Sequence, residues 1–430
     1  MNTEKLYKLY KESSGIATDT RTITQNQIFF ALWGDNFNGN KFASDAIQKG
    51  ASWAIIDDPQ FETEQTILVD DCLQELQALA SHHRKQLNIP VLAITGTNGK
   101  TTTKELIAAV LSTKFRVHYT KGNLNNHIGV PLTILSAPQD TQLMIVEMGA
   151  NHIGEITALC NIANPDHGII TNIGTAHIEG FGSFEGVVKA KTELYQYLRK
   201  VNGVALYNEK DQLLTEKIFK YVNRAVPYTD PYGIPLVVEQ EPSDLNLVVS
   251  VNYIHKNYKI STNLFGKYNY WNIKAAIAAG LFFEVPMADI VNAIERYTPA
   301  NNRSQVKKTS ANTLICDSYN ANPSSMHNAL QSFSELEATD RMVILGDMLE
   351  LGATSENEHR KIIEDLDRFG ILKAFLVGKI FSEVYKGDKY KIFKDSASLA
   401  EYLRNNPLKG NVILVKGSRG IGLEKIYDLL

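Results

Sequence analysis

Residues 91–103 combine side-chain types that could bind a phosphate. Four apolar residues lead into a glycine-rich turn, and a helical pattern of apolar residues follows it. Backbone N–H groups in such a turn and at the start of the next helix point at an anion, and the helix dipole favours its charge. Gly96 and Gly99 let the backbone approach the ligand, Lys100 could reach the β- and γ-phosphates, and Thr101 could offer its hydroxyl to Mg²⁺.

This stretch departs from the common phosphate loop at one position. The usual pattern G-x-x-x-x-G-K-[ST] would place a glycine where this chain has Ile94. A bare Gly-Lys-Thr occurs often by chance, but here a strand pattern and a helix pattern flank it. We therefore predict a phosphate loop, and the alternative is an ordinary strand–helix turn with a solvent-facing lysine.

Polar residues follow two other apolar runs. Glu147 comes after residues 144–146, and His177 lies in the loop after residues 167–171. Ligands of parallel α/β sheets gather at the carboxyl ends of the strands, so both residues should face the same crevice as the phosphate loop. Glu147 would then be an oxygen ligand of Mg²⁺, and the alternative is a solvated carboxylate. A lone histidine such as His177 is as consistent with a structural role as with a site.

The roles of three other charged residues are not decided by residue type and position alone. Lys191 is consistent with a surface charge on a helix. Arg303 and Asp317 flank the start of the third unit and could be surface groups or nucleotide contacts.

The elements that must position these residues fall into three α/β units, which we place at residues 1–87, 88–300 and 301–430. Short apolar strands that alternate with helices predict a largely parallel central sheet, followed by a smaller, doubly wound third unit. The expected strands are 28–32, 53–56, 91–94, 144–146, 167–171, 203–207, 313–316, 342–345, 374–377 and 412–415, and the expected helices are 42–50, 73–87, 103–111, 184–198 and 269–281.

Composition excludes several classes of protein. The 430 residues carry a formal net charge of −3, so no global field attracts nucleic acid or anionic lipid. No apolar run approaches the roughly 20 residues of a membrane span, and the N-terminal residues lack the apolar core of a signal peptide. Cys72, Cys160 and Cys316 lie far apart without metal-ligand spacing, which favours buried thiols in a reducing cytoplasm.

The whole chain resembles the Mur ligases, the ATP-dependent amide-bond-forming enzymes of peptidoglycan synthesis. The family's phosphate motif T-G-T-N-G-K-T occurs at residues 95–101, which accounts for the departure at Ile94. Further family motifs follow in the expected order: Glu147-Met-Gly-Ala, Asn172-Ile-Gly-Thr-Ala-His177, Ala190-Lys191-Thr-Glu193, Asn269-Tyr-Trp-Asn272, Arg303 and Asp317-Ser-Tyr-Asn-Ala-Asn-Pro323.

Within the family, the chain is most similar to the branch that adds D-alanyl-D-alanine to UDP-N-acetylmuramoyl-tripeptide. The motifs that carry this similarity are Gly122-Asn-Leu-Asn-Asn-His-Ile-Gly-Val-Pro131, Ile344-Leu-Gly-Asp-Met-Leu-Glu-Leu-Gly352 with His359, Leu414-Val-Lys-Gly-Ser-Arg419, and the N-terminal Asp19-Thr-Arg21 with Phe29-Phe-Ala-Leu32. The D-N-P-R pattern of the diaminopimelate- and lysine-adding branch is absent, and Asn320-Ala-Asn-Pro323 stands in its place. His127 occupies a position where we expect an acidic residue, which leaves its role open.

The resemblance implies ATP, two Mg²⁺ ions and a carbamylated Lys191. It implies a UDP-sugar-binding first unit, a central ATPase-like unit and a Rossmann-like third unit. The implied catalytic residues are Lys100, Lys191, His177 and Arg303, and the implied metal ligands are Thr101, Glu147, His177 and Lys191. The implied nucleotide contacts are Gly96, Thr97, Asn98, Gly99, Lys100, Thr101, Thr102, Asn269, Asn272, Arg303 and Asp317. The implied substrate contacts are Asp19, Arg21, Asn123, Asn125, Asn126, Tyr319, Asn320, Lys416, Ser418 and Arg419.

The expected partners are therefore two small molecules, UDP-N-acetylmuramoyl-tripeptide and D-alanyl-D-alanine, with no nucleic acid, no membrane insertion and a monomeric state. Two alternatives remain: a sibling ligase, including one of the folylpolyglutamate synthase type, and a nucleotide-binding regulatory protein without catalysis. The asparagine-rich segment 123–126 and the UDP-type first unit disfavour the folate enzyme. The combination of Lys100, Glu147, His177 and Lys191 disfavours the regulatory protein.

Overall fold

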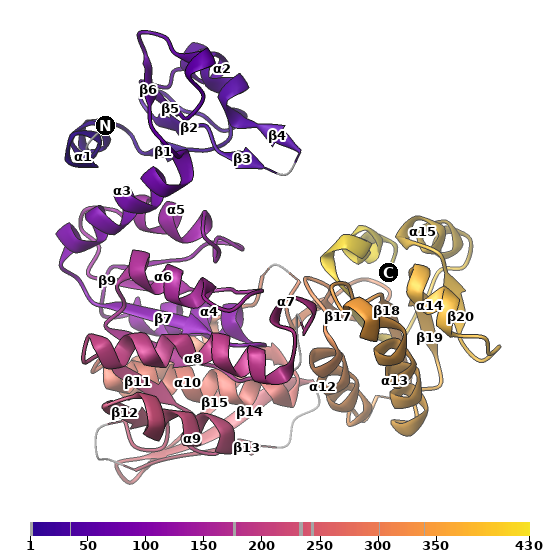
Figure 1. The fold of residues 1–430 in the computed structure, drawn as a ribbon. Helices are drawn as coiled ribbons and strands as arrows, with labels where there is room; N and C mark the ends of the chain where they lie inside the picture. Colours follow the sequence, from indigo (N-terminus) through magenta and orange to yellow (C-terminus); the bar gives the residue numbers. More distant parts are fainter. Residues whose placement is uncertain are drawn as a thin grey trace.

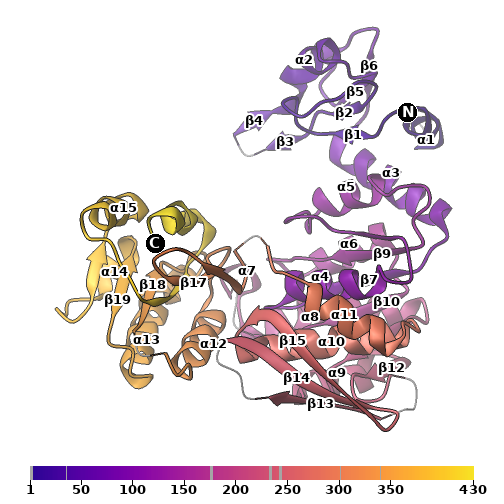
Figure 2. The same cartoon turned by 180° about the vertical axis from the view of Figure 1, so that it is seen from behind.

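A computed structural model describes residues 3–34, 36–174, 178–231, 235–241, 245–300, 302–338 and 340–430. Figure 1 shows three α/β units, with the N-terminal unit above the central one and the C-terminal unit beside it. The view from behind shows the same arrangement (Figure 2). The predicted α/β class with parallel sheets is confirmed, and the boundaries at residues 87/88 and 300/301 stay predictions.

The N-terminal unit is built on a four-stranded parallel sheet in the order β1-β2-β5-β6. A small antiparallel hairpin, β3–β4, extends from it. Its elements are α1 (Thr3–Glu12), β1 (Ile16–Ala17), β2 (Ile28–Phe30), β3 (Trp33–Gly34), β4 (Phe37–Asn38), α2 (Ala43–Gln48), β5 (Trp53–Ile56), β6 (Thr66–Leu68) and α3 (Cys72–Leu87).

Helix α3 links this unit to the central one. The Arg84 guanidinium donates to the carbonyl of Ala163 at 2.9 Å and pairs with Asp166 at 3.0 Å. The hydroxyl of Tyr10 on α1 donates to the carbonyl of Leu135 at 2.7 Å. Because these bonds join buried Tyr10 and Arg84 to the central unit, they anchor the α1–α3 pair to it.

The central unit contains a six-stranded parallel sheet in the order β12-β11-β10-β7-β9-β8. Every residue of β7 and β9 is buried, as their continuous apolar runs require for strands covered on both faces. Its strands are β7 (Val91–Thr95), β8 (Val117–Tyr119), β9 (Leu143–Glu147), β10 (His167–Ile170), β11 (Val204–Tyr207) and β12 (Arg224–Pro227).

Helices cover both faces of this sheet. Val91 and Ala93 pack in the same cluster as residues of α6 and α8, whereas Leu92 and Ile94 pack with residues of α4 and α10. This division follows the alternation of side chains along a strand. The helices are α4 (Lys100–Leu111), α5 (Gly129–Leu135), α6 (Glu155–Ala163), α7 (Ile178–Phe181), α8 (Phe184–Lys200), α9 (Gln212–Tyr221), α10 (Tyr270–Phe282) and α11 (Met287–Arg296).

The second sheet runs from the central unit into the C-terminal one. Three antiparallel strands, β13 (Leu236–Glu241), β14 (Asn246–Tyr253) and β15 (Lys256–Phe265), meet β16 (Gln305–Lys308) through the pair Leu264 and Gln305. Beyond β16 the order is β17-β21-β18-β19-β20, and these five strands are parallel. They are β17 (Thr313–Asp317), β18 (Arg341–Gly346), β19 (Ala374–Val377), β20 (Lys391–Phe393) and β21 (Val412–Lys416).

The C-terminal sheet also carries helices on both faces. Residues of α12 (Pro323–Ser334), α13 (Ser355–Arg368) and α14 (Lys379–Val384) share one apolar cluster. Residues of α15 (Ser396–Asn405) and of the 3₁₀ segment Leu423–Leu429 share another. No helix in the described part of the chain has both the length and the apolar character needed to cross a bilayer.

Candidate active site

The predicted phosphate loop joins β7 to α4 at the carboxyl end of the central sheet. Gly96 and Gly99 have φ angles of +141° and +77°, which favour glycine. A Cβ at position 96 would lie 2.0 Å from Thr171 Oγ1. The chain therefore makes a tight turn that leads directly into the helix. The first N–H groups of α4 have no partner within the helix and are available to an anion.

A residue outside our site prediction, Asn172, fixes the loop from the neighbouring strand. Its side chain accepts from the backbone N–H of Asn98 and donates to the Asn98 carbonyl, both at 3.0 Å. Its own carbonyl accepts from the N–H of Thr97 at 2.9 Å. Asn172 begins the Asn-Ile-Gly motif, but the sequence does not show that this side chain bonds the loop.

Lys100 folds back over the loop that precedes it. Its ammonium donates to the carbonyls of Gly96 at 2.8 Å and Thr97 at 3.0 Å. Burial and the positive charge of Arg303 lower the pKa of Lys100, while Glu147 acts in the opposite direction. The loop thus holds a cation where a bound phosphate needs one.

Glu147 lies beside the loop at the end of β9 and is 2 % exposed. Its Oε1 accepts from Thr101 Oγ1 at 3.2 Å and from the side-chain amide of Asn125 at 2.8 Å. Its Oε2 is buried without a hydrogen-bond partner. A buried carboxylate oxygen without a hydrogen bond, next to a hydroxyl, suits a hard divalent cation, so these residues fit Mg²⁺.

Lys104 is a second residue that sequence reasoning missed. It is fully buried on α4, and its ammonium lies 3.5 Å from Glu147 Oε2. An uncompensated charge is costly in such a place, so the pairing holds both side chains together. A lysine one turn after the phosphate loop gives no sequence signal that distinguishes it from a surface residue.

Lys191 on α8 is buried rather than at the surface, with 3 % exposure. Its ammonium lies 3.5 Å from the Ala150 carbonyl and 5.5 Å from the ring centre of Phe181. Burial and the positive charge of Lys100 lower the pKa of Lys191 to about 7, although two nearby glutamates act in the opposite direction. The amine is thus partly neutral, and therefore nucleophilic, near neutral pH.

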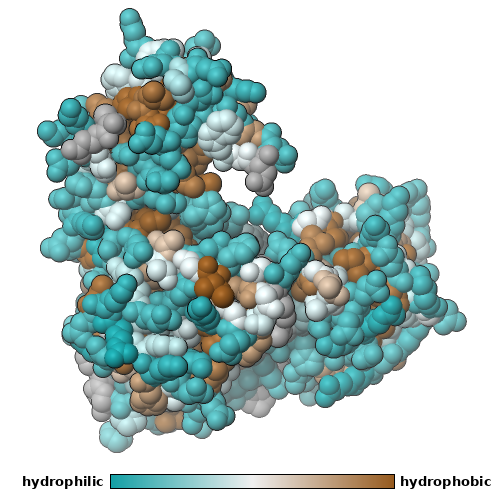
Figure 3. Space-filling model, in the orientation of Figure 1, coloured by the Kyte–Doolittle hydropathy of each residue, from teal (hydrophilic) through white to brown (hydrophobic). Residues whose placement is uncertain are grey.

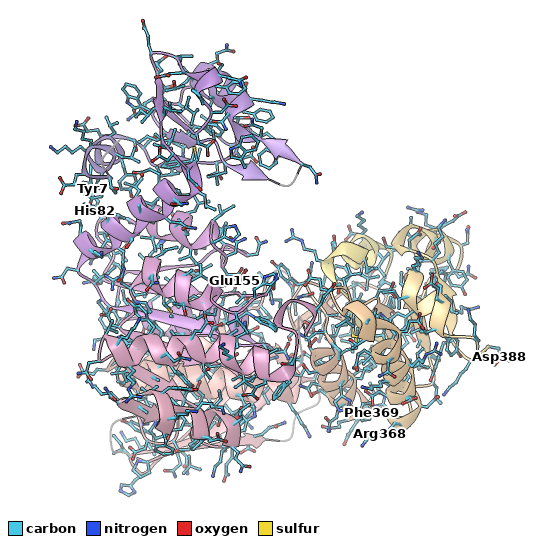
Figure 4. All side chains as sticks on the ribbon, in the orientation of Figure 1. Tyr7, His82, Glu155, Arg368, Phe369 and Asp388 are labelled. Atoms are coloured by element: carbon cyan, nitrogen blue, oxygen red, sulfur yellow. The ribbon has the colours of Figure 1, made fainter. Side chains whose placement is uncertain are left out.

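Glu193 orders the loop that faces Lys191. Its carboxylate accepts from the N–H groups of Gly154 at 2.6 Å and Thr157 at 2.8 Å, at the start of α6. Glu155, the first residue of α6, lies on the side of the central unit that faces the C-terminal unit (Figure 4). His177, which we predict as a catalytic residue and metal ligand, lies outside the described residues.

Two buried asparagines at the start of α10 pack against the phosphate loop and the first turn of α4. Asn272 accepts from the Thr103 hydroxyl at 3.0 Å, and a Cβ at Gly99 would lie 2.5 Å from its Oδ1. Asn269 accepts from Asn272 at 2.8 Å and donates to the Phe265 carbonyl at 2.7 Å. Their predicted contact with the nucleotide stays a prediction, while these bonds give them a supporting role.

The C-terminal unit contributes a cluster of cations around Tyr319. The guanidinium of Arg303 lies 3.7 Å from the ring centre, and that of the exposed Arg419 lies 5.4 Å from it. Nearby, Asp317 accepts from the Lys416 ammonium at 2.6 Å and from the Ser304 N–H at 3.0 Å. Asp317 and Lys416 therefore neutralise each other, whereas Arg303 has a buried Nε without a hydrogen-bond partner.

The remaining predicted substrate residues are spread over all three units. Ser418 is buried and bonds to Leu349 and Ala321, whereas Asn320 is exposed. Asn126 accepts from two N–H groups at the start of α5, and Asn123 is exposed.

In the N-terminal unit, Asp19 and Arg21 form an exposed ion pair at 2.6 Å. The space-filling view shows an open hollow between this unit and the C-terminal one (Figure 3). The structure thus brings the phosphate loop, Thr101, Glu147 and Asn125 together, and does not bring together the predicted contacts of the two outer units.

A phosphate loop at the end of a parallel sheet, a carboxylate beside it and cations from a further α/β unit define a nucleotide-dependent enzyme. Three family models match the chain: "Mur ligase family, catalytic domain" at residues 12–109, "Mur ligase middle domain" at 94–280, and "Mur ligase, glutamate ligase domain" at 302–419. The chain belongs to the Mur ligase family, which confirms the predicted resemblance.

Curated relatives match along nearly their whole length. The UDP-N-acetylmuramoyl-tripeptide--D-alanyl-D-alanine ligase of Bacillus subtilis (strain 168) is 37% identical, over 97% of this chain and 93% of the relative. The ligase of the same name from Escherichia coli (strain K12) is 31% identical, over 96% of this chain and 93% of the relative.

Solved structures agree. A MurF crystal structure from Acinetobacter baumannii superposes with a TM-score of 0.86 at 30% identity, covering 98% of this chain and 97% of that chain. The MurF ligase of Thermotoga maritima in complex with ADP superposes with a TM-score of 0.85 at 24% identity, with the same coverage of the two chains, and shows the shared fold.

Proposed function

We propose that this protein joins D-alanyl-D-alanine to UDP-N-acetylmuramoyl-tripeptide with hydrolysis of ATP to ADP and phosphate, giving the UDP-muramoyl-pentapeptide precursor of peptidoglycan. Full-length similarity to ligases of that name carries the proposal. The phosphate loop with Lys100 and Glu147 beside it is the geometry that such a reaction needs.

The reaction has two steps. A carboxylate oxygen at the end of the tripeptide attacks the γ-phosphorus of ATP, ADP leaves, and an acyl phosphate forms. The amine of D-alanyl-D-alanine then attacks the acyl carbon, phosphate leaves, and the amine loses its proton as the amide forms. The first step brings two anions together, so it depends on positioning and charge neutralisation more than on covalent catalysis. Lys100 and Arg303 would supply the positive charge.

Thr101 and Glu147 would hold one Mg²⁺, which neutralises charge on the β- and γ-phosphates when bound. No group of three or more His, Cys, Asp or Glu side chains within the described ranges is arranged as a metal site. This agrees with an ion that takes most of its ligands from phosphate and water. A second Mg²⁺ would involve His177.

We also propose that Lys191 is carbamylated. A neutral amine can attack CO₂ and lose a proton, and the product is an anion in place of a cation. A pKa of about 7 makes the neutral amine available at physiological pH. The anion would lie on the same side of the sheet as Lys100, whose charge then favours it rather than opposing it.

The two substrates would bind through different units. Asp19 and Arg21 of the N-terminal unit would contact the UDP-sugar, while Asn123, Asn125 and Asn126 of the central unit would contact the muramoyl-tripeptide. Tyr319, Asn320, Lys416, Ser418 and Arg419 would bind D-alanyl-D-alanine, since the cations around Tyr319 suit its carboxylate. We expect a cytoplasmic protein, because the three cysteines are free and buried, as reducing conditions allow. We also expect it to be a monomer.

A phosphate-release assay with a matrix of substrates tests the function. The purified protein should release phosphate with ATP, UDP-N-acetylmuramoyl-tripeptide and D-alanyl-D-alanine together, and Lys100→Ala serves as the inactive control. Release that requires a single free amino acid instead of the dipeptide would assign the chain to another branch. ATP binding without release under any combination would favour a regulatory protein.

A further inference from the structure

The side chain of Asn98, in the phosphate loop, bonds to the C-terminal unit. Its Nδ2 donates to Ser324 Oγ at 2.8 Å, and its Oδ1 accepts from the Asn322 amide at 2.8 Å. Ser324 Oγ in turn donates to Asn322 Oδ1 at 3.0 Å. The three side chains form a closed ring in which each donates once within the ring, and such connected bonds strengthen one another.

The ring is not needed to shape the loop itself. The backbone of Asn98 is already held on both sides by Asn172, which belongs to the central unit. The Asn98 side chain therefore takes no part in shaping the loop, and its hydrogen bonds go to the neighbouring unit. They reach the start of α12, where Asn322 caps the helix by accepting from the Ser325 N–H at 2.9 Å.

The same C-terminal unit presents the cations of the site. Arg303 stacks on Tyr319, only a few residues before Asn322, and Arg303 is near enough to Lys100 to influence its pKa. Whatever holds α12 against the loop therefore also holds Arg303 close to the phosphate loop. If a nucleotide contacts both units, it binds only to molecules in which the units are docked. Its apparent affinity therefore falls as the docked fraction falls.

We propose that Asn322 and Ser324 are positioning residues that dock the C-terminal unit onto the phosphate loop through Asn98, and so set the affinity for ATP. This inference rests on the proposed function, because it assumes that ATP is the ligand of the loop. Neither residue needs to contact the nucleotide.

Matched serine variants test the proposal. Ser324→Ala removes two bonds of the ring and leaves the helix cap in place. Ser325→Ala alters the adjacent serine of the capping box, which bonds to Asn322 but not to Asn98. Asn322→Ser keeps a good N-cap residue and removes the amide that donates to Asn98. Calorimetric titration of the full chain with a non-hydrolysable ATP analogue and Mg²⁺ gives Kd for each protein.

Each of Ser324→Ala and Asn322→Ser removes one hydrogen bond between the units. We expect each to raise Kd by about three- to tenfold, the range for loss of one ordinary hydrogen bond. The Kd of Ser325→Ala should stay within about twofold of the wild-type Kd, even if thermal unfolding shows that Ser325→Ala and Ser324→Ala lose equal stability. In a double-mutant cycle, adding Ser324→Ala to the Asn98→Ala protein should raise Kd little further.

Equal Kd values for wild type and Ser324→Ala would overturn this inference alone. A wild-type protein that does not bind the analogue would overturn the proposed function and this inference with it.

Discussion

At the scale of single residues, burial changes what a side chain can do. Lys191 is a lysine on a helix that the sequence could equally place at the surface, yet only 3 % of it is exposed. Loss of water around the ammonium favours the neutral amine, and Lys100 favours it further. The chemistry that we propose for Lys191 depends on this environment and not on the residue type alone.

The first prediction concerns this amine. Lys191→Ala should lower ligation by on the order of 10²–10³-fold, and short carboxylic acids in the buffer should restore part of it, since they replace the missing anion. With ¹³C-labelled bicarbonate, wild type should give a carbamate signal in ¹³C NMR. Its formation should be slower as the pH falls through about 7, because the amine becomes protonated.

The matched control is Lys200→Ala, which alters an exposed lysine at the end of the same helix. It should leave both the carbamate signal and the activity unchanged. If ATP binding is intact but Lys191→Ala regains no activity with any small acid, the carbamate is excluded.

At the scale of elements, the docking of α1 on α3 depends on a neutral histidine. The His83 ring packs at 5.1 Å from the Tyr10 ring, and its Nδ1 lies 3.3 Å from the Tyr7 hydroxyl. Figure 4 shows Tyr7 next to His82, the adjacent residue on α3. Burial, with Lys11 and His82, lowers the pKa of His83 to about 4.

The second prediction follows from this shift. Because the unfolded chain binds a proton near pH 6.5 and the folded chain only near pH 4, stability should fall as the pH drops between these values. The loss from this group should reach about 3 kcal/mol at pH 4. His83→Phe keeps an aromatic ring and removes the titration, so urea unfolding between pH 7 and 4 should show a weaker dependence than wild type. A His83→Phe curve parallel to wild type would contradict the assignment.

The secondary structure expected from the sequence is present, but the expected set is incomplete. It gave no range for the helices α1, α5, α6, α9 and α11 or for the antiparallel strands β13, β14 and β15, and it also omitted strands at sheet edges. Strands such as β7 and β9 are predictable because continuous apolar runs are buried on both faces. The strands β6, β8, β12 and β20 lie at the edges of their sheets and are short and partly exposed, so their patterns carry little apolar signal.

At the scale of the whole molecule, the proposed substrate contacts lie on units that are separated by an open hollow (Figure 3). The acyl phosphate must be protected from water, so the units have to approach each other during the reaction. The contact between Asn98 and α12 shows that the central and C-terminal units already touch at the phosphate loop.

The third prediction is therefore a compaction. In small-angle X-ray scattering, the radius of gyration of the full chain should decrease when a non-hydrolysable ATP analogue, Mg²⁺ and UDP-N-acetylmuramoyl-tripeptide are added together. Lys100→Ala should keep the profile of the free protein under the same conditions. An unchanged profile of wild type at saturating ligand would show that closure is not part of binding.

The sequence by itself determined the phosphate loop, the fold class and the family. These depend on local features: an apolar strand, a glycine turn, a lysine at the start of a helix, and motifs in a fixed order. The position of Glu147 was also predictable from the sequence, since the end of a parallel strand places it at the same edge of the sheet as the phosphate loop.

Only the tertiary structure showed which residues form hydrogen bonds or ion pairs with the phosphate loop and Glu147. Asn172 holds the loop, Lys104 pairs with Glu147, and Ser324 bonds to Asn98 across 226 positions of the chain. Contacts of this kind have no pattern in the sequence, because a hydrogen bond depends on distance and direction in space. The pKa of Lys191 is set in the same way, by the water and the charges that folding removes from it or brings near it.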